Sequence, residues 1–123
     1  MMFLYALILI WALIIFAFSS IQNPSNFGSS VIFSIVFHLV EYIILAFLVT
    51  IAFHRTNRFS NLFFLVGVPL ILVALYAVSD EIHQSYVDGR QASVKDFYLD
   101  VFGASLGIFC ARLCIFLRSR LIQ

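Results

Sequence analysis

Charged residues are scarce in this chain of 123 residues: Asp, Glu, Lys and Arg together make up 11%, less than half of the roughly 25% typical of soluble domains. None of them occurs in residues 1–40. Hydrophobic residues make up 63%, and Phe alone occurs 15 times. A soluble domain of this size leaves much of its surface in water and could not hide so much apolar surface. The composition excludes a soluble monomer and a disordered chain, and a formal net charge of +1 argues against a nucleic-acid partner.

Cysteines and short catalytic motifs are also few. The two cysteines, Cys110 and Cys114, are four residues apart, so on a helix they share one face of one segment. We expect them to pack rather than to form a disulfide or a thiol metal site. No H-E-x-x-H, G-x-S-x-G or P-loop motif is present, so no short motif indicates a reaction. The class that remains is an integral membrane protein.

Four apolar runs predict four transmembrane helices, each long enough to cross a bilayer core of about 30 Å. The predicted spans are at about residues 2–21, 30–53, 59–80 and 95–117. No Lys or Arg precedes the first run, which is too long for the h-region of a signal peptide, so we expect a retained span. Gly67 and Pro69 are expected to kink the third span. The predicted fold class is all-α: one transmembrane domain over residues 1–123, a bundle of four helices with short connections.

Basic residues near the span ends predict the orientation. Arg55 and Arg58 follow the second span, and Arg118 and Arg120 follow the fourth. Four spans place these residues and both termini on one side of the membrane. We therefore expect the N and C termini to be cytoplasmic, in a multi-pass protein of the cell membrane. The segment from Asp80 to Lys95 would then face outward.

Ionisable side chains gather in the predicted outer half of the bundle. His38, Glu41 and Tyr42 are spaced to share one face of the second span. A charged group near the middle of a membrane is costly, so Glu41 is expected to have a function. Asp96 and Asp100 begin a stripe on the fourth span, and the third span ends nearby. That end carries Asp80, Glu81, His83 and Gln84. These groups are predicted to meet in one polar pocket that opens outward.

Several nearby residues have structural interpretations. Gly103 and Gly107 continue the stripe of the fourth span, and their spacing is typical of close helix packing. Asp88-Gly89 is foremost a turn signal. Ser93, three residues before Asp96, is expected to cap the fourth helix.

The motif residues resemble the signature of the VanZ-like family. That signature is Asp-Glu-x-x-Gln, an aromatic residue, Gly-Arg, Ser, Asp and spaced glycines. The matching positions are Asp80, Glu81, Gln84, Tyr86, Gly89, Arg90, Ser93, Asp96, Gly103 and Gly107. His38 and Tyr42 resemble the family's His-x-x-x-Tyr. The chain departs from the pattern at Asp100, where the family usually has Asn, and at Asp88, where it usually has Pro; Glu41 lies outside the pattern.

The resemblance implies a small multi-span protein of the cell envelope. The family's name-giving member is a resistance factor against the lipoglycopeptide antibiotic teicoplanin, so the resemblance implies glycopeptide antibiotic resistance of the teicoplanin type. The resemblance implies no settled biochemical activity.

The preferred functional hypothesis is a pocket that binds a membrane lipid, a lipid-linked precursor or a lipoglycopeptide. Arg90 would bind a phosphate or carboxylate through two parallel hydrogen bonds and would pair with Glu81 or Asp96. The expected ligand-binding residues are His38, Glu41, Tyr42, Asp80, Glu81, Gln84, Arg90, Asp96 and Asp100.

Two alternatives remain open. One is an intramembrane enzyme that modifies a lipid or a lipid-linked phosphate, with Glu81, His83 and Asp96 as candidate catalytic residues. A divalent metal is an allowed cofactor of such an enzyme, although not the favoured one. The other is a proton or ion pathway through Glu41 and Asp100. The sequence leaves the oligomeric state open.

Overall fold

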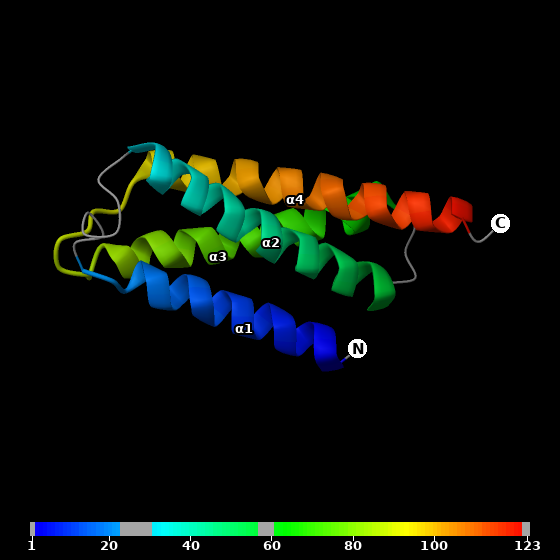
Figure 1. The fold of residues 1–123 in the computed structure, drawn as a ribbon, viewed down its shortest axis with the longest axis horizontal. Coiled ribbons are helices and arrows are strands. Elements are labelled where there is room, and N and C mark those ends of the chain that lie inside the picture. The colour runs from blue at the N-terminus through cyan, green and yellow to red at the C-terminus, as the bar shows by residue number, and fades with distance from the viewer. Residues whose placement is uncertain (1, 23–30, 57–60, 122–123) are drawn as a thin grey trace.

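The protein is a bundle of four long helices in the computed structural model, which describes residues 2–22, 31–56 and 61–121. The helices are α1 (Met2–Ser19), α2 (Val31–Thr56), α3 (Val68–Gln84) and α4 (Val94–Leu121), and a π-helical turn, η2 (Phe63–Gly67), leads into α3. No strand occurs in the described ranges. Four segments are long and apolar enough to span a membrane, which confirms the predicted all-α membrane bundle. Both termini lie at one end of the bundle, and the α3–α4 connection lies at the other (Figure 1).

The helix ends differ from the predicted span limits by a few residues. α2 continues to Thr56, whose hydroxyl donates to the carbonyl oxygens of Ala52 and Phe53. α3 continues to Gln84 rather than ending at residue 80, and α4 runs from residue 94 to residue 121. α1 ends at Ser19 instead of residue 21. Polar residues that flank the apolar runs therefore belong to the helices. The limits predicted at residues 30 and 59, and Arg58, lie outside the described residues.

The irregularity predicted near Gly67 and Pro69 is a π-helical turn. The backbone N–H of Val68 donates to the carbonyl oxygen of Phe63, five residues earlier. Pro69 is the second residue of α3. Because η2 leads directly into α3 as one span, Phe63–Gln84, the lack of an N–H in proline removes one hydrogen bond from the helix at this point. The wider turn thus ends just before the proline, and the third span continues without a break.

α2 and α4 pack closely because small residues line their contact. A Cβ atom added to Gly103 would come within 2.9 Å of the carbonyl oxygen of Leu39, and one added to Gly107 would overlap the carbonyl oxygen of Ile43. Ala46 and Ala104 are fully buried in the same contact region. This is the close packing that the glycine spacing predicts.

α1 lies along α2 and α3 on the side of the bundle away from α4 (Figure 1). Hydrogen bonds attach the middle of α1 to both of these helices. Trp11 donates through Nε1 to the carbonyl oxygen of Glu41 at 2.9 Å, and the Tyr76 hydroxyl donates to the carbonyl oxygen of Ala12 at 2.6 Å. Large apolar side chains such as Phe3, Phe102 and Phe109 face outward, as a protein surrounded by lipid requires.

Candidate functional site

A cavity of about 340 Å³ lies between the helices in the half of the bundle away from the termini. Its polar wall consists of Ser19, Ser34, His38, Glu41, Asp80, Gln84 and Asp96, and its apolar wall of Ile15, Phe18, Ile21, Phe33 and Phe37. Gly89, Arg90 and Gln91 line it from the α3–α4 connection. All four helices and this connection therefore contribute to one cavity.

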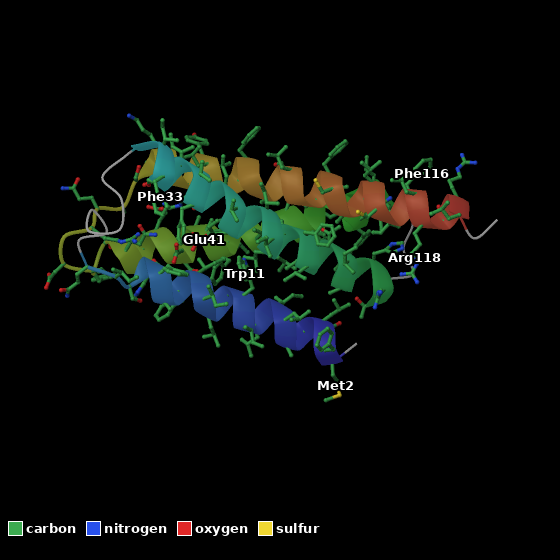
Figure 2. All side chains as sticks on the ribbon, in the orientation of Figure 1. Met2, Trp11, Phe33, Glu41, Phe116 and Arg118 are labelled. Carbon is green, nitrogen blue, oxygen red and sulfur yellow. The ribbon has the colours of Figure 1, made fainter. Side chains whose placement is uncertain are left out.

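α2 supplies the deepest acidic group of the cavity. Glu41 lies ten residues after the start of α2, or about 15 Å along a helix that rises 1.5 Å per residue. Figure 2 places Glu41 between α2 and its neighbours, in the half of the bundle away from Met2 and Arg118. Its side chain is only 7% exposed, and Oε1 has no hydrogen-bond partner in the described residues.

The last turns of α3 place a second carboxylate in the same wall. Asp80 is 5% exposed and accepts a hydrogen bond from Gln84 Nε2 through Oδ2, at 3.0 Å. Its other oxygen, Oδ1, has no partner in the described residues. Because α3 continues to Gln84, Asp80 and Gln84 are one helical turn apart and face the cavity together.

A buried hydrogen bond between His38 and Asp100 joins α2 to α4 beside the cavity. His38 Nδ1 and Asp100 Oδ1 are 2.9 Å apart, and Asp100 is completely buried. His38 lines the cavity, while Asp100 lies behind it. Tyr42 is also fully buried behind the wall, and its hydroxyl has no partner in the described residues.

Glu81 does not line the cavity, because it holds the start of α4. Its Oε2 accepts a hydrogen bond of 2.7 Å from the backbone N–H of Ser93. Ser93 in turn accepts through Oγ from the backbone N–H of Asp96, at 3.3 Å, which is the predicted N-cap. Gly89 makes the preceding turn with a φ of 81°, a conformation that glycine adopts without strain.

The predicted ion pair between Arg90 and Glu81 or Asp96 is wrong. Arg90 instead donates through Nε to the carbonyl oxygen of Ile21 at 3.2 Å and through Nη2 to that of Phe18 at 3.0 Å. A cation at this place also interacts favourably with the negative end of the α1 dipole. Arg90 therefore attaches the α3–α4 connection to α1 at the edge of the cavity.

The three candidate catalytic residues make different contacts. Asp96 lines the cavity, Glu81 binds Ser93, and His83 lies against α1. The His83 ring stacks on Phe16 with centroids 4.3 Å apart, and its Nε2 is 2.9 Å from Ser20 Oγ. In the described residues no three His, Cys, Asp or Glu side chains form a group that could hold a metal ion.

Sequence reasoning missed the apolar wall and the serines of the cavity. Phe18, Phe33 and Phe37 carry no signal of their own in a chain with 15 phenylalanines. Ser19 is 4% exposed, with its hydroxyl unpartnered among the described residues, but nothing in the sequence distinguishes it from neighbouring Ser20.

A family model described as VanZ/LLP1 matches residues 2–117. The chain belongs to the VanZ-like family. Comparison with curated proteins and with solved structures gave no match.

In this VanZ-like chain the signature residues have two different environments. Those that line the cavity are His38, Asp80, Gln84, Gly89, Arg90 and Asp96. Those that hold the helices around it are Glu81, Ser93, Gly103 and Gly107. Tyr86 is exposed on the connection. Among the acids outside the signature, Glu41 lies in the cavity wall and Asp100 lies behind it.

Proposed function

We propose that this VanZ-like membrane protein binds the polar headgroup of an envelope lipid, a lipid-linked precursor or a lipoglycopeptide in its cavity. The observation that carries the proposal is the composition of the cavity wall. Phe18, Phe33 and Phe37 contribute apolar surface to the lining, which also carries carboxylates, amides and a guanidinium. Ligand sites commonly combine apolar walls with a few convergent polar groups in this way. A lipid carries apolar acyl chains and a polar headgroup in one molecule.

The proposal includes an outward orientation of the cavity. Arg118 and Arg120 lie in the last turn of α4 and Arg55 in that of α2, at the end of the bundle where both termini lie. Basic residues at span ends favour the cytoplasmic side. With the termini inside the cell, the cavity opens toward the outer leaflet.

Arg90 is suited to bind the anionic part of such a ligand. A guanidinium has five N–H donors, and Arg90 uses two of its nitrogens on the carbonyl oxygens of Ile21 and Phe18. Donors that remain can bind a phosphate or carboxylate at the edge of the cavity.

Native mass spectrometry of protein purified in a gentle detergent tests the proposal. We expect a lipid-type molecule to copurify with the native protein and its occupancy to fall about tenfold in Arg90→Ala, as for loss of a charged hydrogen-bond donor. Arg90→Lys should retain part of the binding, because lysine keeps the charge but loses the fork of donors. Arg118→Ala, at the opposite end of the bundle, is the matched control.

Equal occupancy in the native protein, Arg90→Ala and Arg90→Lys would contradict the role of Arg90. Circular dichroism and the elution volume of each variant separate loss of the ligand from loss of the fold. A change in the mass of an added lipid, absent in Glu81→Gln, would instead favour the enzyme alternative.

A further inference from the structure

The lining of the cavity has three buried polar atoms without a hydrogen-bond partner, two carboxylate oxygens and one hydroxyl. They are Glu41 Oε1 from α2, Asp80 Oδ1 from α3 and Ser19 Oγ from α1, and none has a partner within the described residues. All three residues are more than nine-tenths buried and line the same cavity. Buried polar atoms normally have a hydrogen-bond partner, because leaving one unpaired costs free energy. A ligand that carries hydrogen-bond donors would satisfy these three atoms.

The charges around the cavity favour a cationic donor. Its wall carries three carboxylates, from Glu41, Asp80 and Asp96, and one guanidinium, from Arg90. The imidazole of His38 is already paired with Asp100, which lies outside the wall. The hydrogen bonds of Arg90 go to the carbonyl oxygens of Phe18 and Ile21, so none of them joins Arg90 to an acid. A ligand cation would compensate the negative charge of these carboxylates.

The acceptors fit a primary ammonium group better than other cations. An ammonium group carries three N–H donors and no acceptor, which matches two carboxylate oxygens and one hydroxyl oxygen. A divalent metal ion takes about six oxygen ligands, whereas no three His, Cys, Asp or Glu side chains in the described residues lie close enough together to hold one metal ion. A quaternary ammonium group has no N–H donor and would leave all three acceptors unpaired.

We propose that Glu41, Asp80 and Ser19 form a receptor for a primary ammonium group on the ligand, with the ligand's phosphate at Arg90. This inference rests on the proposed function, since it specifies the headgroup that the same cavity binds. The chemistry described is that of a phosphoethanolamine group. It occurs on a membrane lipid and also on small soluble molecules.

A competition between lipids with identical acyl chains tests the proposal. The purified protein is incubated with equal amounts of dimyristoyl phosphatidylethanolamine, phosphatidylcholine and phosphatidylglycerol, and native mass spectrometry measures the retained lipids. We expect phosphatidylethanolamine to be retained about tenfold more than either of the others, as for a charge-assisted hydrogen bond gained or lost. Soluble glycerophosphoethanolamine distinguishes the sources: efficient competition identifies a free phosphoethanolamine ligand, and failure to compete identifies the lipid.

Three variants connect the preference to the acceptors. In Glu41→Gln and Asp80→Asn, which keep the side-chain shape but remove the charge, the ratio of phosphatidylethanolamine to phosphatidylglycerol should fall toward one; Ser19→Ala should reduce it less. Asp88→Asn makes the same chemical change at an exposed acid outside the cavity wall and should keep the native ratio.

Different results would contradict the proposed function and the ammonium receptor. If no lipid is retained by the native protein, the proposed function is wrong. If lipids are retained without preference among headgroups, or if phosphatidylcholine equals phosphatidylethanolamine, only the ammonium receptor is overturned. An unchanged ratio in both Glu41→Gln and Asp80→Asn would also overturn it.

Discussion

The His38–Asp100 pair is a buried polar contact between α2 and α4. Its atoms are 2.9 Å apart, and Asp100 is entirely removed from solvent. Such a pair need not stabilise a fold more than apolar residues would, but removing one partner leaves the other buried and unpaired. The pair also fixes the imidazole of His38 in the cavity wall.

We expect Asp100→Ala to reduce the stability of the bundle by about 1–3 kcal/mol, because it leaves a buried imidazole without its partner. Asp100→Asn should cost less, since its amide oxygen can still accept from Nδ1. Thermal unfolding in detergent, followed by circular dichroism, measures both, with Asp88→Asn as the control. An Asp100→Ala protein that unfolds at the native temperature would show that the pair contributes nothing.

Some contacts of individual side chains could be predicted from the sequence, and others could not. Helical spacing alone turns His38 and Asp100 toward the interior, where the structure brings them together. The acceptors of Arg90 are backbone carbonyl oxygens of Ile21 and Phe18, and every residue has such an oxygen. No pattern of side chains could have indicated them.

Of the contacts between helices, the one between α2 and α4 depends most on glycines, which have no side chain. Gly107 faces the carbonyl oxygen of Ile43 with no space for a Cβ atom. Because α2 carries His38 and Glu41 and α4 carries Asp96, a change in this spacing would also change the cavity.

We expect Gly107→Ala to destabilise the bundle by about 1–3 kcal/mol, the usual cost of overpacking a tight contact. Ser105→Ala introduces the same residue two positions away, at an exposed site on α4, and should change little. The unfolding temperatures of the two variants test this. A Gly107→Ala protein as stable as Ser105→Ala would mean that the helices can separate without cost.

The existence of the helices could be predicted from the sequence, but their ends could not. Long apolar runs specify a span, whereas a helix end depends on local capping, such as the Thr56 hydroxyl on the carbonyl oxygens of Ala52 and Phe53. The polar end of α3 remains helical, so Asp80 and Gln84 point in one direction. The π-helical turn before Pro69 likewise depends on backbone register.

For the molecule as a whole, the arrangement separates two ends with different chemistry. One end holds both termini and the basic last turns of α2 and α4, and the other holds the cavity. The four spans could be predicted from hydropathy, while the side of the membrane that the cavity faces is a proposal based on a few basic residues. Lipid-headgroup binding from outside the cell requires that orientation.

Cysteine labelling in intact cells tests this central claim most directly. The two native cysteines, which are exposed, are first replaced in a Cys110→Ala, Cys114→Ala background. Gln91→Cys then places a thiol at the cavity, and Ser119→Cys places one near the C-terminus. Gln91 and Ser119 are both exposed in the native protein. We predict that a membrane-impermeant maleimide labels Gln91→Cys in intact cells and Ser119→Cys only after permeabilisation. Labelling of Ser119→Cys in intact cells, with Gln91→Cys protected until permeabilisation, would contradict the account.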